Sequence, residues 1–326
     1  MPLNSIPPTL DRAAFDLKRD AAARSAHVDH SLWGGLVSAS APRLRRLARR
    51  GVVGVKAFMV PSGVPEFPHL TDSTLEPAVR AATRAGLLVA VHAEPEASAV
   101  ARIARVAGTT GARVHVVHVG SAAGVRAIAR ARARGVRITG ETCPHYLTFT
   151  AADVKRVGPA LKCSPRIGSS RDRDALWRAV LRGELDLIAS DHSPSPAAMK
   201  EVPFERAWGG VAGIQSFLPA LMTEGRARGL SLSRLAWLTA TAPARLLGIA
   251  RRKGSLRVGA DADAILVDPD RRWTLTRREV QARSAISPYV GRRLRGFVVR
   301  TIVRGRTIQQ EGEIVSGPGW GQLVLP

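Results

Sequence analysis

Several residue types are scarce in this chain of 326 residues, and each scarcity excludes a class of protein. The only cysteines are Cys143 and Cys163, so the fold cannot rest on a disulfide framework, and we expect a cytoplasmic location. No segment approaches the roughly 18 consecutive apolar residues of a membrane-spanning helix, so we expect no membrane partner. The opening residues, "MPLNSIPPTLDR", lack the basic and apolar blocks of a secretory signal.

Acidic residues are also scarce, with 26 Asp and Glu against 49 Lys and Arg, and the net charge is +23. Such a charge can indicate a nucleic-acid partner. The arginines, however, are spread between apolar positions of helix-like segments, at 43–51, 125–135 and 171–183. Aromatic residues make up only 5%, and no helix-turn-helix, zinc-finger or RNP pattern occurs. We therefore expect no nucleic-acid partner and attribute the charge to a compositional preference for arginine.

The hydrophobic residues, 45% of the chain, are arranged in alternating strand-like and helix-like segments. Strands are predicted at 52–59, 87–94, 113–120, 136–143 and 185–193, and helices at 74–86, 96–107, 122–134, 171–181, 213–226 and 231–247. This alternation predicts an α/β fold with a parallel sheet and helical crossovers. From about residue 254 the segments become short and alternating, which indicates a small antiparallel β domain. We expect two domains, 1–252 and 253–326.

One predicted strand contains a residue that does not suit a buried position. In "GVVGVKAFMV", residues 51–60, Lys56 lies among valines, alanine and phenylalanine. An ammonium group in such surroundings loses its hydration. It must then become neutral, find an anionic partner or be chemically modified.

Polar residues lie near the carboxyl ends of successive predicted strands: Lys56, His92, His118, Glu141 and Asp191. In a β/α barrel these strand ends meet on the active-site face. Taken singly, each histidine could be a core residue, and the aspartate could cap a helix. The joint pattern instead favours a divalent metal site, with Zn²⁺ the first choice.

The other histidines are expected to have different roles. Side-chain direction places His115 opposite to His118, as a core residue. Two histidines that adjoin the site are expected to orient the ligands, and these are His145 and His192. The histidines near predicted turns are expected at the surface, and these are His27, His30 and His69.

Eight ordered motifs resemble consecutive blocks of a cyclic amidohydrolase: "GVKAFMVPSG", "VAVHAE", "VHVVHVGSAAGV", "TGETCPHYL", "LKCSPRI", "LIASDHSPSPAAMK", "AWGGVAGIQ" and "SPYVGRRL". Within that superfamily they are most similar to the allantoinases, with dihydroorotases and hydantoinases as relatives. The resemblance implies a (β/α)8 TIM-like barrel of the metal-dependent hydrolase type with a β-sandwich. It implies hydrolysis of the ring amide of allantoin to allantoate, a step of purine catabolism. A dihydroorotase or hydantoinase activity, or a catalytically silent homologue acting as a structural partner, stays open.

The same resemblance implies roles for the strand-end residues. Lys56 would be carboxylated by CO₂, and the carbamate would bridge two Zn²⁺ ions. His92 and His118 would bind the more exposed ion, and Asp191 would bind the buried ion and act as general base. The ions would lower the pKa of a bridging water that attacks the ring amide carbonyl.

The resemblance also implies substrate contacts. Ser164 of "LKCSPRI" and Gly209 and Gly210 of "AWGGVAGIQ" would contact a small cyclic ureide. "LKCSPRIG" has Arg166 and Gly168 where the family tends to have proline and arginine. A homo-oligomer is expected.

The main departure from the family pattern is that no H-x-H motif occurs in the sequence. In the family, that motif lies on the first barrel strand and supplies two ligands of the buried ion. Residues 1–8 resemble the loop after the second barrel strand. We therefore expect an incomplete barrel without its first strands, with unpaired sheet edges and a partial C-terminal β-sandwich. At most one Zn²⁺ is expected to bind well, and hydrolysis is expected to be impaired.

Overall fold

The computed structural model describes residues 5–326, which form a six-stranded and a four-stranded sheet. Of the loop-like segment 1–8, residues 1–4 lie outside the described residues. The larger sheet is parallel, in the order β1-β2-β3-β4-β5-β6. Its strands are β1 (Gly34–Gly35), β2 (Val55–Phe58), β3 (Val89–His92), β4 (Val114–Val116), β5 (Ile138–Thr142) and β6 (Leu187–Ile188).

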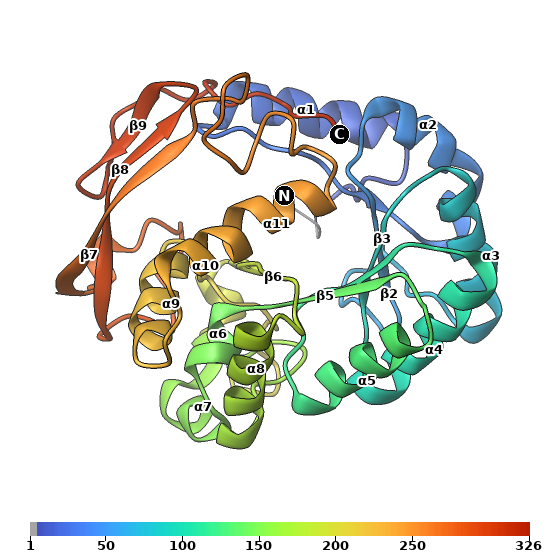
Figure 1. Cartoon of the computed structure of the whole chain (residues 1–326), viewed down its shortest axis with the longest axis horizontal. Helices are drawn as coiled ribbons and strands as arrows, with labels where there is room; N and C mark the ends of the chain where they lie inside the picture. The colour runs from blue at the N-terminus through green and yellow to red at the C-terminus, as the bar shows by residue number, and fades with distance from the viewer. Residues whose placement is uncertain (1–4) are drawn as a thin grey trace.

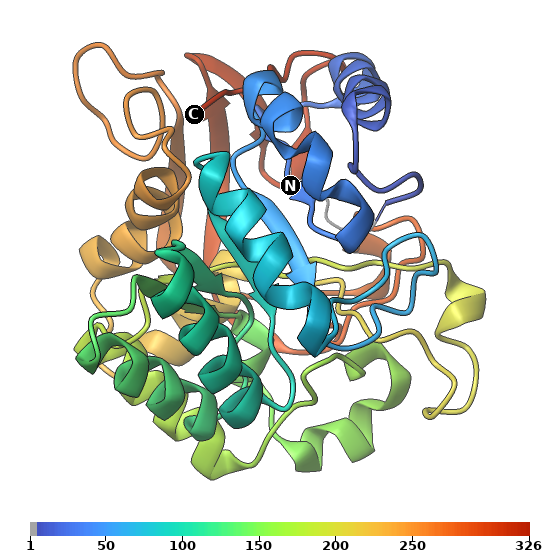
Figure 2. The ribbon, with the colours of Figure 1, turned by 90° about the vertical axis from the view of Figure 1, so that its right-hand side faces the viewer.

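Helices connect these strands, as the alternating pattern predicts. They are α2 (Leu44–Arg50), α3 (Asp72–Arg84), α4 (Glu96–Thr110), α5 (Ala122–Ala133), α6 (Pro144–Thr148), α7 (Ala151–Val157) and α8 (Ser170–Arg182). Figure 1 shows α2 to α5 in an arc outside the strands, and Figure 2 shows the same helices in front of the sheet. Helices outside and strands inside are the arrangement of a β/α barrel. The prediction of an incomplete barrel is confirmed.

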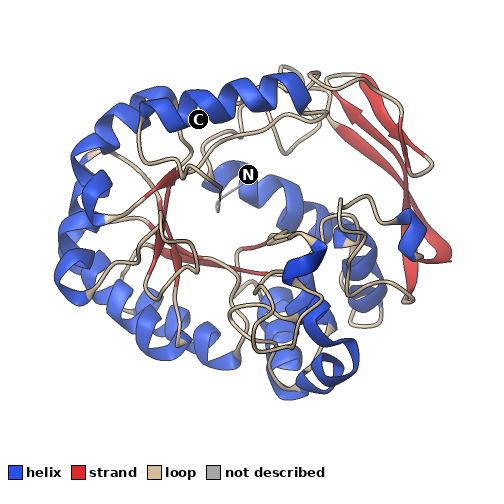
Figure 3. Ribbon diagram, turned by 180° about the vertical axis from the view of Figure 1, so that it is seen from behind, coloured by secondary structure: helices blue, strands red, loops and turns tan. Residues whose placement is uncertain are grey.

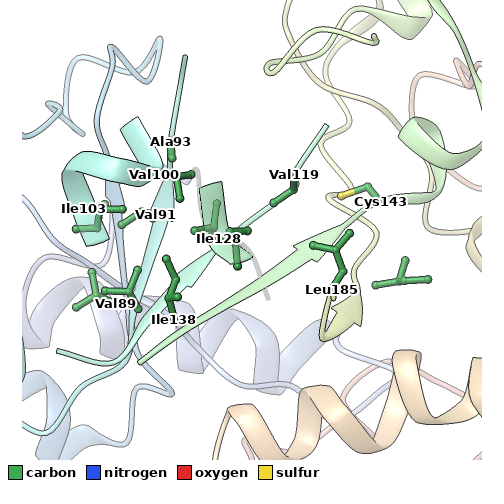
Figure 4. Close-up of a cluster of buried hydrophobic side chains, with 14 of the residues drawn as sticks. Val89, Val91, Ala93, Val100, Ile103, Val119, Ile128, Ile138, Cys143 and Leu185 are labelled. Carbon is green, nitrogen blue, oxygen red and sulfur yellow. The ribbon is translucent and has the colours of Figure 1, made fainter. Parts of the chain in front are cut away.

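The strands and their covering helices are joined by a continuous apolar core (Figure 4). Val89 and Val91 of β3 are fully buried, as are Val100 and Ile103 of α4. Each such side chain contributes about 1.5–3 kcal/mol relative to an exposed one. This packing fixes the position at which β3 ends, and His92 is its last residue.

The edges of the larger sheet are two-residue strands, β1 and β6. Close packing covers β1: Gly35 donates its N–H to the Thr9 carbonyl at 2.8 Å. A Cβ at Gly35 would lie 2.5 Å from Leu10 Cδ2, so this position has no room for a side chain. Short, covered edges reduce the risk of pairing with another chain.

The second sheet is antiparallel, in the order β10-β9-β8-β7. It contains β7 (Ala264–Thr274), β8 (Arg293–Val303), β9 (Arg306–Gln310) and β10 (Glu313–Ile314). Figure 3 shows its strands apart from the larger sheet. It contacts α9 (Phe217–Arg226), where Thr223 Oγ1 accepts from the Arg295 N–H at 2.8 Å. The partial C-terminal sandwich is confirmed, and the domain boundary at 252/253 stays a prediction.

Some elements differ from the sequence prediction. The sequence pattern missed α1 (Arg12–Ser25), because this helix buries only Ala14 and Phe15 and so has little apolar periodicity. The segment predicted as one helix at 231–247 consists of α10 (Leu232–Ala236), a π-helical turn at 237–241 and α11 (Ala242–Leu246). No helix in residues 5–326 is both long and apolar enough to span a membrane.

Candidate functional site

Lys56 lies within β2, paired with Gly35 of β1 and Ala90 of β3, and its exposed fraction is only 2%. Its Nζ lies 3.9 Å from the centroid of the Phe58 ring, which faces the same side of the strand. Burial lowers the pKa of Lys56 to about 8, although Asp191 and Glu141 act in the opposite direction. The lysine is therefore as buried as the sequence indicates, and a neutral amine is accessible near neutral pH.

His92 and His118 come from neighbouring strands and their rings face one another. His92 Nδ1 lies 3.0 Å from His118 Nε2, and both residues are 5% exposed. His118 follows β4 in a left-handed conformation, with φ of 42°. Burial lowers the pKa of both histidines, and the nearby Lys56 acts in the same direction. Both imidazoles are thus neutral near pH 7, which is the form that binds metals.

Glu94 connects His92 with a second loop. His92 Nε2 lies 3.1 Å from Glu94 Oε2, and Ser164 Oγ donates to the same oxygen at 2.6 Å. The hydrogen bond from His92 is the main cause of a lowered pKa of Glu94. A carboxylate on Nε2 leaves the Nδ1 lone pair free to face His118. No role for Glu94 was predicted from the sequence. Its position two residues after the histidine, in "VAVHAE", is the only available signal.

Asp191 follows β6 with a positive φ of 41°, a conformation uncommon for residues other than glycine. Burial raises its pKa to about 6, and Lys56 partly offsets this. A carboxylate oxygen of Asp191, Cys143 Sγ and a ring nitrogen of His145 all lie within 4.8 Å of one another. His145 is 1% exposed, and burial lowers its pKa to about 3. The sequence predicts His145 beside the site that contains Asp191, and it does not indicate Cys143 there.

Loops around the site hold the residues predicted to contact substrate. A Cβ at Gly209 would lie 4.0 Å from the Ser164 backbone nitrogen, so these two residues are neighbours. Gly210 is different: a Cβ there would lie 2.7 Å from the Ser193 carbonyl oxygen, so it packs against the loop after Asp191. Lys200 Nζ donates to the carbonyls of Pro159 and Trp208, each at 2.8 Å, and so links the loops.

Glu96 ties the start of α4 to the chain after β4. Its Oε1 accepts from the Gly120 N–H at 2.6 Å, and its Oε2 accepts from the Ser121 hydroxyl. Burial raises the pKa of Glu96 to about 7. The carboxyl therefore positions the segment that follows His118.

The remaining histidines differ partly from expectation. His115 is a buried core residue, as predicted, with Nδ1 2.8 Å from Thr139 Oγ1. His192 Nδ1 accepts from the Ile214 N–H at 3.3 Å. His30 is partly buried: both its ring nitrogens are buried, and its backbone pairs with Leu323 of the returning C-terminal segment. His27 and His69 are partly buried.

The fold and the site together define a class of protein. A parallel sheet with helices outside it, a lysine, histidines and an aspartate at its strand ends, and an attached small β-sheet are features of barrel-type hydrolases. The amidohydrolase family model matches residues 15–308, and the chain belongs to this family.

Individual relatives and structures agree with this assignment. An allantoinase of Rubrobacter xylanophilus is 45% identical over 359 residues, covering 100% of this chain and 78% of the relative. An allantoinase of Escherichia coli K12 is 34% identical, covering 100% of this chain and 79% of the relative. The L-hydantoinase (dihydropyrimidinase) of Arthrobacter aurescens has a TM-score of 0.96 at 30% identity, covering 100% of this chain and 80% of that one. The resemblance to the allantoinases is confirmed, and the chain is an allantoinase-like hydrolase of cyclic amides.

Proposed function

We propose that this chain hydrolyses the ring amide of allantoin to allantoate, as a step of purine catabolism, at a centre formed by Lys56, His92, His118 and Asp191. The observation that carries the proposal is the 3.0 Å separation of His92 Nδ1 and His118 Nε2 beside the buried Lys56. The allantoinase relatives, up to 45% identical over the whole chain, favour allantoin among the cyclic amides.

The two histidines fit a zinc ion. Tetrahedral Zn²⁺ with Zn–N distances of about 2.0–2.1 Å holds two ring nitrogens about 3.3 Å apart, close to the 3.0 Å seen here. His118 Nδ1 is buried and has no hydrogen-bond partner among residues 5–326, so this nitrogen does not compete with a bound ion for the ring's orientation. A bound zinc ion supplies Lewis acidity and a lowered pKa of bound water.

Lys56 is proposed to act as a carbamate. With its pKa lowered to about 8, a sizeable fraction of the amine is neutral at pH 7–8 and can attack CO₂. In that reaction an N–C bond forms, one N–H proton is released, and the neutral amine becomes an anionic carbamate. The product carries oxygen donors beside the two histidines. This conversion resolves the unfavourable burial of the ammonium group.

Asp191 is proposed as the general base. With a pKa raised to about 6, it is mostly ionised at pH 7 and yet accepts a proton readily. The same group can return that proton to the leaving ring nitrogen. Ser164, Gly209 and Gly210 are proposed to contact the ring. Support comes from the hydrogen bond of Ser164 to Glu94, which ties the predicted substrate contact to His92, and from the nearness of Gly209 to Ser164.

We propose that turnover by residues 1–326 is far below that of the relatives. The sequence contains no H-x-H motif, so the family's two further ligands to the buried ion are not supplied by such a motif. For comparison, loss of a single oxyanion-hole donor costs about 10²–10³-fold in kcat. Loss of the ligands that hold the nucleophile should cost more.

The test is to express residues 1–326, add Zn²⁺ and bicarbonate, and measure turnover of allantoin, hydantoin and dihydroorotate. We expect slow hydrolysis with a preference for allantoin, and none in His118→Gln or Lys56→Arg. His27→Gln, far along the chain from the strand ends, is the matched control and should keep the wild-type rate. A preference for hydantoin would favour the second candidate function, which the TM-score of 0.96 to an L-hydantoinase supports. No hydrolysis of any of the three would favour a silent homologue and overturn the proposal.

Cytoplasmic location and homo-oligomer formation remain predictions. Size-exclusion chromatography with light scattering checks the second of these. A monomer over the whole accessible concentration range would contradict it.

A further inference from the structure

Three groups with strong affinity for transition metals meet where β5 ends and the chain leaves β6. Cys143 Sγ, one ring nitrogen of His145 and one carboxylate oxygen of Asp191 lie within 4.8 Å of one another. Cys143 is 0% exposed and His145 is 1% exposed. Cys143 and His145 lie at the start of α6, after β5, and Asp191 lies in the loop after the neighbouring strand β6.

Local structure brings the three groups together. Cys143 is the N-cap of α6, and Pro144 at the first helical position makes the chain turn sharply there. His145 follows one residue later, inside the fold. Asp191 has the uncommon φ of 41°, so the backbone turns at this residue and does not continue as an extended strand.

An unpaired polar atom marks the cluster as a site. His145 Nε2 is buried and has no hydrogen-bond partner among residues 5–326. Buried polar groups are nearly always paired, and an exception needs an explanation, of which a bound ion is one. The second cysteine offers a contrast: Cys163 Sγ donates to the Pro165 carbonyl at 3.2 Å and belongs to no such cluster within residues 5–326.

We propose that Cys143, His145 and Asp191 bind a second divalent ion of the zinc class. Thiolate and imidazole favour Zn²⁺ or Co²⁺ over Mg²⁺ or Ca²⁺, and the carboxylate adds a negative charge. On binding, the Cys143 S–H bond breaks, the proton leaves to the solvent, and a sulfur–metal bond forms. The ion is neither oxidised nor reduced. A three-ligand set leaves a fourth position open.

This inference deepens the proposed function, because Asp191 belongs to both. The second ion site depends on the proposed function only because both use Asp191. Its ligands differ from the H-x-H ligand set that the family resemblance implies. The chain's own cysteine and histidine then provide two ligands that the sequence analysis expected to be missing. The prediction of at most one well-bound ion would accordingly be replaced by two.

The experiment titrates Co²⁺ into the full chain without substrate and records the absorption spectrum. We expect a near-ultraviolet thiolate-to-cobalt charge-transfer band that saturates at one ion per chain. Cys163→Ala should keep the band, and Cys143→Ala should abolish it. The double variant His92→Gln/His118→Gln should keep the band while losing hydrolysis. Absence of the band in the wild type, or its persistence in Cys143→Ala, would overturn the proposal.

A second measurement covers the case in which Cys143→Ala does not fold, as judged by circular dichroism. His145→Gln keeps the thiol and removes one ligand. Outer-shell changes cost about 10–100-fold in metal affinity, so loss of a direct ligand should weaken Co²⁺ binding at the thiolate site by more than about 100-fold. Unchanged affinity would count against the site. A thiolate band without allantoin turnover would support this site and refute the proposed function. Turnover without the band would support the proposed function and refute this site.

Discussion

Glu94 offers a direct test of the proposed centre, because it accepts from His92 and from Ser164 through one oxygen. We consider Glu94→Gln. The amide oxygen of glutamine can still accept both hydrogen bonds, so the substitution removes the negative charge and leaves the contacts. Without that charge His92 Nδ1 becomes a weaker ligand. Carboxylates that orient a metal-bound histidine contribute about 10–100-fold to metal affinity, or about 1.4–2.7 kcal/mol.

The exposure of Glu94 decides where in this range the effect should fall. Its side chain is 32% exposed, so solvent screens part of the charge, and we expect about a tenfold loss. Glu94→Ala, which removes the hydrogen bonds as well, should approach a 100-fold loss. The assay is competition for Zn²⁺ against a chromophoric chelator at pH 7.5. Two sites, if present, are separated by first blocking the thiolate site in the Cys143→Ala background.

Glu76→Gln is the matched control. Glu76 pairs with Arg80 at 2.6 Å on the outer face of α3, and its side chain is 46% exposed. Removing that charge should leave Zn²⁺ affinity unchanged within twofold. The reasoning is refuted if Glu94→Gln behaves like this control. A loss well beyond 100-fold would also refute it, because Glu94 would then be a ligand itself.

Three further predictions concern the framework of the site. Gly54 lies just before β2, and a Cβ there would lie 2.8 Å from the Leu88 carbonyl oxygen, so Gly54→Ala should lower the free energy of unfolding by about 1–3 kcal/mol. Gly108 lies in α4 and a Cβ there would have nothing within 4 Å, so Gly108→Ala should raise the free energy of unfolding by about 0.5–1 kcal/mol. Urea unfolding measures both changes. Burial raises the pKa of Glu96 to about 7 from 4.5, so the folded state holds this proton more tightly. Its stabilisation is complete below about pH 4.5 and is lost as the pH rises through about 7, by at most about 3 kcal/mol; a pH series in which wild type and Glu96→Gln keep a constant difference in unfolding free energy would contradict this. Lys200→Met should speed proteolytic cleavage of the linked loops several-fold, since its Nζ donates to the Pro159 and Trp208 carbonyls, and an unchanged cleavage rate would show that these bonds do not hold the loops.

The fold was predictable wherever a segment buries a periodic apolar face. The strands around Lys56 and His92 are apolar on both sides, as in a parallel sheet covered by helices, and their pattern is clear in the sequence. Helix α1 was not predictable in this way, because it buries only two residues. The pairing of His30 with Leu323 was also missed, since nothing local in either segment indicates a contact between the two ends of the chain.

For the candidate site, too, some residues were predictable from the sequence and others were not. The carboxyl ends of parallel strands meet at one edge of the sheet, so strand position alone was enough to nominate His92 and His118. Contacts between loops follow no such rule. The link from Glu94 to Ser164 depends on how the loop carrying Ser164 folds back. The cluster of Cys143 with Asp191 depends on the conformation of residues after two different strands. Sequence spacing carries no signal for either.

The electrostatics of the strand ends connect these observations. Lys56 is buried and Asp191 is partly buried, and their pKa values move toward one another, to about 8 and about 6. In such a pair the charged forms are only slightly favoured over the neutral forms, because desolvation opposes the charge on each member. Carboxylation of Lys56 would turn its attraction for Asp191 into repulsion, and a cation between the two anions would offset that change while leaving Asp191 ionised. A carbamate on Lys56 and a metal ion near Asp191 are therefore mutually dependent. Loss of the thiolate site should accordingly lower the CO₂ content of the protein, even though neither Cys143 nor His145 reacts with CO₂.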